Sequence, residues 1–227
     1  MRYNFGMNGF ELFVDSFTKI LIPGLTATIP LTIISFALAI IIGTAMALIQ
    51  FSDIIILKQI ARFYIWITRG TPLLVQLFVI FYGLPSIGIV IDPFPAAVIV
   101  FSLNEGAYVA ETIRGALESI PKGQIEASYC SGLNFVQTMW HIVLPQAFKV
   151  AFPSLANSLI SMIKDTSLAS NITVLEMLMK TKQLVAVYYQ PLLLYCEVGL
   201  IYLLFSTILS KIAGLIENKL SRKAIVS

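Results

Sequence analysis

Charged side chains are scarce in this sequence of 227 residues. Asp, Glu, Lys and Arg make up 12% of the chain, hydrophobic residues make up 58%, and the mean hydropathy is +0.88. An ordinary soluble domain has about 25% charged residues, so this composition excludes that class. The net charge of +3 is spread along the chain, which argues against a cationic stripe that follows nucleic-acid phosphates.

The residue types that build reactive centres are also rare. Cys130 and Cys196 are the only cysteines, and His141 is the only histidine. We expect the cysteines to be unpaired and His141 to make a packing or surface contact, because no CxxC or Cys/His cluster indicates a metal site. GxxxxGK[ST], HExxH, GxSxG and GxGxxG are all missing. The sequence therefore predicts no catalytic, metal or cofactor site on this chain.

Long uncharged stretches take the place of these motifs. Residues 20–52 and 70–91 contain no charged side chain, and a bilayer span takes about 20 apolar residues. We expect an all-α integral membrane protein with five spans, at about 25–50, 60–83, 94–117, 144–163 and 191–215. In the second span we expect a kink at Pro72, because proline removes a backbone donor and crowds the preceding turn.

The ends of the chain have a different character. Residues 10–21 place apolar side chains on one face of a helix and charged side chains on the other. This pattern predicts an amphipathic segment, 1–22, lying on the membrane surface. The alternative is a fraying start of the first span. Pro23 and Gly24 are expected to bend the chain into the membrane domain, 23–217, and a basic tail, 218–227, follows. We expect no cleavable signal peptide, because residues 1–19 lack a basic region followed by an apolar core.

Residues 127–148 are uncharged but are not expected to span the membrane. The segment carries eight serine, asparagine, glutamine, threonine, histidine and glycine residues that lipid would not tolerate. Burying an unpaired amide or hydroxyl costs on the order of 2–7 kcal/mol. We therefore predict two short helices around a turn at Gly132, within a loop at 118–143.

The distribution of lysine and arginine predicts the orientation in the membrane. With the carboxyl terminus in the cytoplasm, ten cations lie inside or at inner span ends and five lie outside, which favours an outer amino terminus. The inner set is Lys58, Arg62, Arg69, Arg114, Lys122, Lys149, Lys211, Lys219, Arg222 and Lys223. The outer set is Arg2, Lys19, Lys164, Lys180 and Lys182.

Glu105 is the most informative single residue, since it lies halfway along the third span beside Asn104. A charge at the bilayer centre costs at least about 2.5 kcal/mol and needs a partner, a water-filled cavity or a proton. Contact with a substrate is one hypothesis for Glu105. The alternative is a capping box, Ser102 to Glu105, that starts a helix after a break. Glu111 and Arg114, farther along the span, are expected to pair with each other.

Two further polar segments could line a pathway. In Arg69 to Gln76, Gly70 and Pro72 permit local unwinding, and Arg69 either receives a carboxylate or extends to the inner interface. After the fourth span, Asp165 either caps a short helix or holds an amine, while backbone N–H groups there bind a carboxylate. The full set of candidate substrate-binding residues is Glu105, Asp165, Asn104, Thr71, Gln76, Arg69, Thr166, Ser167 and Met162.

The predicted loop carries a recognisable pattern. Glu126-Ala127-Ser128, then Gly132, then Ile142-Val143-Leu144-Pro145 resembles the EAA signature of ATP-binding-cassette (ABC) importers, with Ser128 where alanine is usual. In those importers the signature marks the loop that a separate ATPase grips. The resemblance implies that the following residues couple the chain to that ATPase: Glu126, Ala127, Ser128, Gly132, Pro121, Lys122 and Gln124.

Further segments resemble the polar amino-acid permease branch of the same importers: Arg69 to Gln76, Asn104 to Glu111, Ile120 to Gln124 and Lys164 to Leu168. The resemblance implies a type I importer permease with five spans, paired with an identical or homologous permease in the bacterial inner membrane. It also implies two copies of an ATPase subunit that hold ATP and Mg, and an extracytoplasmic substrate-binding protein.

The nature of the substrate follows from Glu105. A mid-membrane carboxylate favours a ligand with an additional amine, hence cystine or a basic amino acid, and Asn104 to Tyr108 is similar to cystine permeases. The alternatives are another polar amino acid such as glutamine, an ion channel in which Glu105 forms a ring, a membrane enzyme, and a scaffold that only assembles partners. The first of these alternatives remains within the importer class.

Overall fold

The computed structural model describes residues 8–52 and 54–225, with side chains up to residue 220. This part of the chain is almost entirely helical and contains no β-strand, so the predicted all-α class is confirmed. Its contacts define two compact units. Unit 1 comprises Met1–Ala37, Pro72–Phe101 and Leu159–Leu209, and unit 2 comprises Leu38–Thr71, Ser102–Ser158 and Ser210–Ser227.

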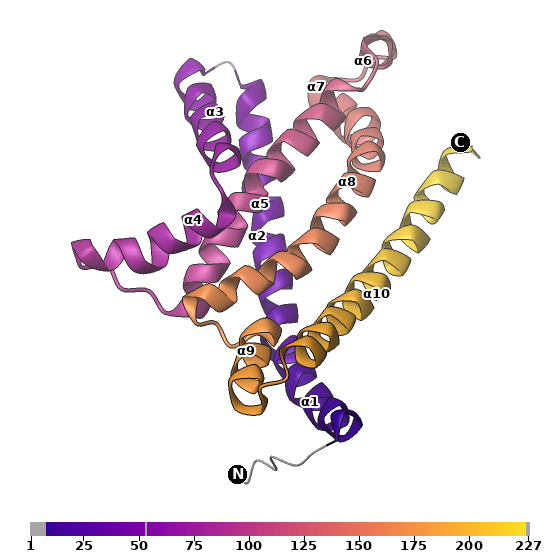
Figure 1. The fold of residues 1–227 in the computed structure, drawn as a ribbon. Helices are drawn as coiled ribbons and strands as arrows, with labels where there is room; N and C mark the ends of the chain where they lie inside the picture. The colour runs from indigo at the N-terminus through magenta and orange to yellow at the C-terminus, as the bar shows by residue number, and fades with distance from the viewer. Residues whose placement is uncertain (1–7, 53, 226–227) are drawn as a thin grey trace. The chain divides into compact units, whose positions relative to one another are not determined.

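The first helical stretch runs from Gly9 to Phe51 without a break (Figure 1). It comprises α1 (Gly9–Pro23), a π-helical turn (Gly24–Thr28) and α2 (Ile29–Phe51). Pro23 keeps helical angles, φ −58° and ψ −29°, and the wider turn after it lets the helix continue past a residue without an amide hydrogen. The residues expected to bend the chain thus lie at a π-helical turn within a continuous helix, and a surface position for the segment before them stays a prediction.

The expected kink at Pro72 is a complete interruption. Helix α3 (Ile55–Gly70) ends before Thr71, whose φ of −119° and ψ of 144° are those of extended chain. Pro72 disfavours helical angles at the residue before it, which accounts for the extended Thr71. Helix α4 (Leu73–Phe78) follows, and continues as a π-helical turn (Val79–Gly83) and a 3-10 turn (Leu84–Ile87).

The remaining elements agree with the predicted order. They are α5 (Pro93–Glu118), α6 (Lys122–Cys130), α7 (Phe135–Thr138), a π-helical turn (Met139–Val143), α8 (Leu144–Asp165), a 3-10 segment (Thr166–Ile172), α9 (Met177–Tyr188) and α10 (Pro191–Ile225). Helix α10 extends into the predicted tail, whose residues 226–227 lie outside the described part, as does Arg2.

Among the described residues, three helices are long and apolar enough to cross a membrane: Gly9–Phe51, Pro93–Glu118 and Pro191–Leu220. The bent pair Ile55–Gly70 and Leu73–Ile87 adds a fourth if it is counted as one span. Helix α8 coincides with the predicted span at 144–163 but is not among them. All five predicted spans thus fall on helices, while their number in a membrane stays a prediction.

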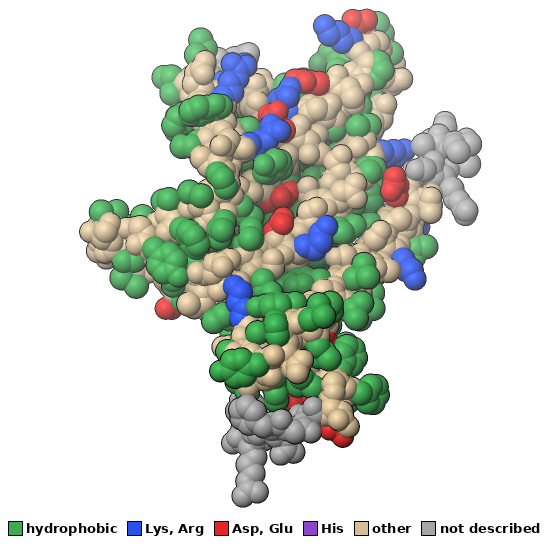
Figure 2. All heavy atoms as spheres, in the orientation of Figure 1, with side chains coloured by type: hydrophobic (Ala, Val, Ile, Leu, Met, Phe, Trp, Pro, Cys, Tyr) green, Lys and Arg blue, Asp and Glu red, His purple; other side chains and the backbone are tan. Residues whose placement is uncertain are grey.

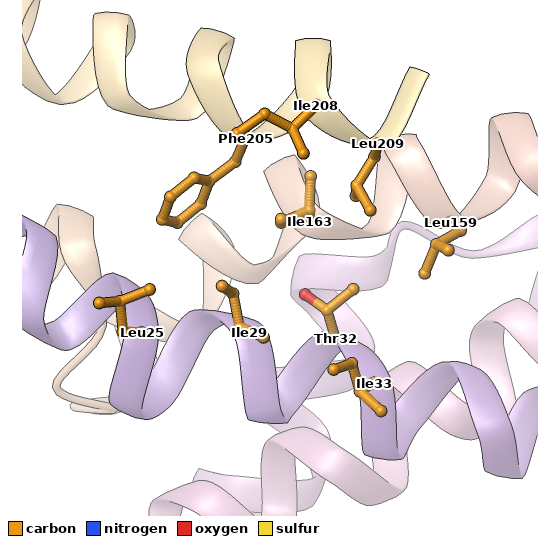
Figure 3. A pocket seen from close by; sticks show the side chains of 9 residues that line it. All are labelled: Leu25, Ile29, Thr32, Ile33, Leu159, Ile163, Phe205, Ile208 and Leu209. Atoms are coloured by element: carbon orange, nitrogen blue, oxygen red, sulfur yellow. The ribbon is translucent and has the colours of Figure 1, made fainter. Parts of the chain in front are cut away.

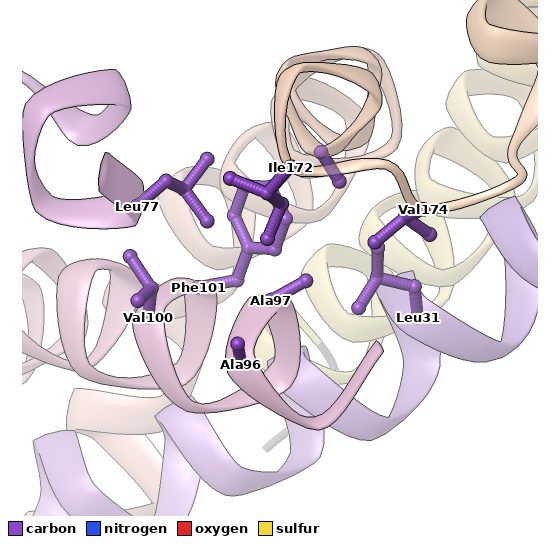
Figure 4. Close-up of a cluster of buried hydrophobic side chains, with 9 residues drawn as sticks. Leu31, Leu77, Ala96, Ala97, Val100, Phe101, Ile172 and Val174 are labelled. Atoms are coloured by element: carbon purple, nitrogen blue, oxygen red, sulfur yellow. The ribbon is translucent and has the colours of Figure 1, made fainter. Parts of the chain in front are cut away.

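Two apolar clusters hold unit 1 together. In the first, Ala97 and Phe101 of α5 lie against Ile172 of the 3-10 segment (Figure 4). In the second, Met177 packs with Ile20 of α1, and Gly24 permits this approach because a Cβ there would lie 2.7 Å from the Met177 sulfur. In lipid, such contacts stabilise by close packing rather than by excluding water.

Small residues allow close helix packing in unit 2. A Cβ on Gly43 of α2 would lie 2.4 Å from Val109 Cγ1 and 2.8 Å from the Gly106 carbonyl oxygen of α5. A Cβ on Gly106 would lie 3.0 Å from the Tyr64 hydroxyl oxygen, which in turn donates to the carbonyl of Leu103. Small residues at such contacts are typical of helix pairs in membranes.

The packing of unit 2 makes Gly43 intolerant of any side chain. Gly43→Ala is expected to lower the free energy of unfolding by about 1–3 kcal/mol, because the added methyl group overlaps Val109 and backbone that has no room to shift. Gly115→Ala is the matched control, because its Cβ meets nothing within 4 Å and alanine favours helix. Thermal unfolding in detergent compares them; equal melting temperatures would contradict the described helix contact.

Candidate functional site

Helices α6 and α7 form the predicted pair of short helices around Gly132. At the end of α6, Gly132 N–H donates to the Tyr129 carbonyl at 2.9 Å and Leu133 N–H donates to the Ser128 carbonyl at 3.1 Å. This pair of bonds is the Schellman arrangement, which places a left-handed residue after the helix. Gly132 has φ of 84°, so the turn requires glycine, and its prediction is confirmed.

The structure explains why position 128 can hold serine where the EAA signature usually has alanine. Its side chain is buried, and its hydroxyl group lies 2.7 Å from the Ile125 carbonyl oxygen and 2.9 Å from the Thr138 hydroxyl oxygen. Ser128 of α6 is therefore linked to Thr138 of α7. A small side chain is needed at this buried position, and serine adds a hydrogen bond that alanine lacks.

The loop exposes both polar and apolar side chains. Pro121, Lys122, Gln124, Glu126 and Ala127 are exposed on or beside α6. Sequence reasoning missed the large exposed apolar side chains next to them: Tyr129 46%, Phe135 66%, Val136 72% and Trp140 70%. Exposed aromatic groups with a polar rim are typical of a protein interface.

The capping-box alternative for Glu105 is wrong. Helix α5 runs from Pro93 to Glu118 without interruption, so no helix starts at Ser102. Asn104 is 8% exposed and Glu105 is half-buried, both in the interior of the helix. An ionisable side chain inside a membrane helix is a functional candidate by default, so substrate contact and a structural pairing within the protein both stay open as hypotheses for Glu105.

A network of charges lies farther along α5. Glu111 accepts from Arg114 at 2.9 Å, which confirms the predicted pair, and its Oε2 also lies 3.5 Å from Arg69 NH1. Arg114 NH1 donates to Glu118 at 2.7 Å, and the Arg69 guanidinium lies 5.2 Å from the Tyr108 ring centre. In Figure 2, blue and red side chains lie next to one another in this part of unit 2. Arg69 therefore has a partner within the protein.

The same charges line a polar pocket of about 250 Å³ in unit 2. Gln50 and Phe51 at the end of α2 and Arg62 of α3 line it together with the acidic and basic side chains of α5. Gln50 Nε2 lies 3.4 Å from Glu111 Oε1. The two carboxylates that line the pocket, those of Glu111 and Glu118, already accept from Arg114, so they are paired within the protein.

Asp165 does not cap a helix, contrary to one of its two predicted roles. Helix α8 passes directly into the 3-10 segment, and Asp165 has helical angles and no capping bond. Met162 and Thr166 are buried, and the Thr166 hydroxyl donates to the Ile163 carbonyl at 2.7 Å. Asp165, beyond the predicted end of the fourth span, is half-buried, and burial raises the pKa of its carboxyl although Lys164 opposes the shift.

Glu176, which sequence reasoning missed, fixes the segment after α8. It is fully buried at the start of α9, where its carboxylate accepts from Leu178 N–H at 2.9 Å and from Met179 N–H at 2.7 Å. Tyr202 of α10 donates to the same group at 2.6 Å. Burial raises the pKa of Glu176, and these hydrogen bonds oppose the shift. Glutamate is not a usual capping residue, so no sequence pattern indicates this role.

An apolar pocket of about 290 Å³ lies in unit 1. Side chains of α2, α8 and α10 and of the π-helical turn line it, and Figure 3 shows Leu25, Ile29 and Phe205 around it. Thr32 supplies the one hydroxyl group in this lining, so the pocket offers no charged partner for the ammonium or carboxylate of an amino acid.

The two units divide the predicted substrate-binding residues. Arg69, Thr71, Asn104 and Glu105 belong to unit 2, whereas Gln76, Met162, Asp165, Thr166 and Ser167 belong to unit 1. The Thr71 hydroxyl donates to the Ile67 carbonyl at 2.9 Å. Within the described part of the chain, no group of three or more His, Cys, Asp or Glu residues could hold a metal ion. Cys130 and Cys196 are free and exposed, as expected.

Comparison with known proteins identifies the class. The family described as "Binding-protein-dependent transport system inner membrane component" matches residues 39–222, and the chain belongs to this family. The chain is the membrane permease subunit of an amino-acid ABC importer, and permeases of this family are not enzymes.

Particular relatives support this assignment. The L-cystine permease TcyB of Bacillus subtilis (strain 168) is 46% identical over 93% of this chain and 91% of its own length. The arginine permease ArtQ of the same organism is 36% identical over 88% of this chain and 92% of its own length. A solved amino acid ABC transporter structure with histidines has a TM-score of 0.86 and 32% identity, and covers 96% of this chain and all of its own.

The charge network predicts unequal roles for two glutamates of α5. Glu111→Gln is expected to lower the free energy of unfolding by about 1–3 kcal/mol, because it leaves Arg69 and Arg114 without their shared carboxylate. Glu118→Gln, the matched control, removes a single exposed ion pair and should cost less than about 1 kcal/mol. Chemical or thermal unfolding in detergent measures both, and an equal loss would contradict the central role of Glu111.

Proposed function

We propose that this permease carries cystine. The observation that supports this most is the 46% identity with the L-cystine permease TcyB over nearly the whole of both chains. A second L-cystine permease, TcyL, is 40% identical over 80% of this chain. A basic amino acid is the second candidate, because ArtQ is 36% identical. Both candidates carry a cationic group in addition to that of a simple amino acid: a second ammonium in cystine, and a guanidinium or ammonium side chain in a basic amino acid.

The chemistry of Glu105 agrees with such a ligand. Its carboxylate lies in the interior of α5, a helix long and apolar enough to cross a membrane, and it has the sign of charge that attracts a cationic group of a ligand. We propose Asn104 and Glu105 of α5 as substrate contacts, together with Thr71, Gln76, Met162, Asp165, Thr166 and Ser167. Arg69 is retained as a weaker candidate, since Glu111 and Tyr108 already hold its guanidinium group.

Partners are implied by the family. Importers of this kind work with an ATPase and a binding protein. We propose two ATPase subunits, which hold ATP and Mg, a second permease subunit and an extracytoplasmic binding protein that delivers the substrate. The carboxyl terminus is proposed to be cytoplasmic and the amino terminus external, with membrane segments within 23–217.

The loop around Gly132 is the proposed joint with the ATPase. Glu126 and its exposed neighbours on α6 supply polar contacts, and Phe135, Val136 and Trp140 supply apolar area. The ATPase shifts the permease between two states only to the extent that it binds this loop differently in each. A loop that keeps one shape transmits such a difference to the helices that flank it.

Substrate recognition by Glu105 is testable in vesicles that contain the full importer and its binding protein. Glu105→Gln is expected to reduce uptake of labelled cystine at least about tenfold, because a lost ion pair worth 1.4 kcal/mol or more changes affinity by that factor. Uptake of arginine and glutamine is measured in parallel. Basal ATP hydrolysis should survive, since α6 and α7 are unchanged.

Glu118→Gln is the control for that experiment, because it removes an exposed carboxylate from the same helix. If Glu105→Gln changes uptake no more than this control for every ligand, then Glu105 is structural. If the wild-type importer takes up arginine but not cystine, the substrate proposal fails while the importer class stands.

Substitution of two glycines tests whether the loop around Gly132 couples the permease to the ATPase. Gly132→Ala is expected to uncouple ATP hydrolysis from uptake or to weaken retention of the ATPase, because a left-handed conformation costs alanine about 1–2 kcal/mol. Gly123→Ala in α6 is the control, since its Cβ also meets open space but its φ is not positive. ATP hydrolysed per substrate imported is the measurement, and equal ratios for both variants would exclude a special role for the Gly132 turn.

A further inference from the structure

Glu197 is a buried carboxyl group that transport does not explain. It lies on α10, is 1% exposed, and has the buried apolar residues Leu194, Val198 and Ile201 as neighbours along the helix. Its Oε2 lies 2.6 Å from the Ser16 hydroxyl oxygen of α1, in the same unit. Its Oε1 is also buried and has no hydrogen-bond partner among the residues that the structure describes.

The hydrogen atoms at this contact can be counted. The Ser16 oxygen lies 2.6 Å from Glu197 Oε2 and also 2.6 Å from the carbonyl oxygen of Leu12. A serine hydroxyl has one hydrogen to donate, and a carbonyl oxygen has none. If Ser16 donates to Leu12, the hydrogen between Ser16 and Glu197 must come from Glu197. A 2.6 Å approach of two oxygen atoms with no hydrogen between them would be repulsive.

Among the described residues, no cation lies close enough to Glu197 to pair with a negative charge. No described lysine or arginine forms an ion pair with it, since Lys19 of α1 pairs with Asp15 and Lys182 of α9 donates to Ser170 and Asn171. Tyr188 of α9 bonds Asp15, and Tyr202 of α10 bonds Glu176. An isolated charge in apolar surroundings is strongly disfavoured unless it is paired, whereas a neutral carboxylic acid with one hydrogen bond is not.

We propose that Glu197 is a proton-binding site, in which the carboxyl group is protonated and donates its hydrogen to Ser16. The bound proton makes the contact between α1 and α10 a neutral hydrogen bond within apolar packing. Ser16 in turn donates a hydrogen bond to the Leu12 carbonyl, so the chain of hydrogen bonds runs from Glu197 through Ser16 to the backbone of α1. Loss of the proton would leave the single Ser16 hydrogen to serve either the Glu197 carboxylate or the Leu12 carbonyl, and the other pair of oxygen atoms would lie 2.6 Å apart without a hydrogen between them.

Infrared spectroscopy of the purified importer in lipid tests the proposal directly. A protonated carboxyl group has a carbonyl stretch that a carboxylate lacks. The expected result at neutral pH is a band of this kind in the wild type that is missing in Glu197→Gln. In Ser16→Ala the band should persist and move to higher frequency, because the acid has lost its acceptor. Absence of any carboxyl band that depends on Glu197 would overturn the proposal.

Thermal unfolding of the same preparations gives an independent result. Glutamine matches the protonated acid in size, is neutral and can donate to Ser16, so Glu197→Gln should melt within about 2 °C of the wild type. A clear rise in melting temperature for Glu197→Gln would overturn the proposal, because that is the effect of removing a buried negative charge.

Discussion

The scarcity of hydrogen-bond partners in an apolar medium is the constraint on which this structure depends. A polar group inside the apolar helices costs free energy unless it has a partner within the protein. The Tyr64 hydroxyl donates to the Leu103 carbonyl, and Glu111 pairs with two arginines. Glu176 accepts from two backbone amides and from Tyr202. These bonds connect helices that apolar contacts alone would hold less specifically.

Much of the fold could be predicted from the sequence because apolar length and proline leave strong signals. The five predicted spans fall on helices, and the turn at Gly132 lies where the polar composition of 127–148 excluded a span. The departures are local. Pro23 is expected to bend the chain. In the structure the helix continues past it through a π-helical turn. Pro72 is expected to kink the helix. It interrupts the helix instead, because proline disfavours helical angles at the residue before it and Thr71 is extended.

The candidate site was harder to predict because its residues depend on partners far away in the sequence. The Glu111–Arg114 pair was predictable, being three residues apart on one helix. The third member, Arg69, was not, since its contact with Glu111 crosses from α3 to α5. The contact of Glu197 with Ser16 and that of Glu176 with Tyr202 were not predictable for the same reason. The roles of the candidate substrate residues stay predictions, as does the coupling role of the Gly132 loop.

The closed turn between α6 and α7 has a consequence for the thermodynamics of partner binding. Two backbone bonds, a glycine in the left-handed region and the Ser128–Thr138 contact hold this loop in one shape. A segment that is ordered in advance loses little conformational entropy when a partner docks on it. Affinity at this surface is therefore set by the contacts themselves, and a single side chain that differs between two partners is enough for the loop to discriminate between them.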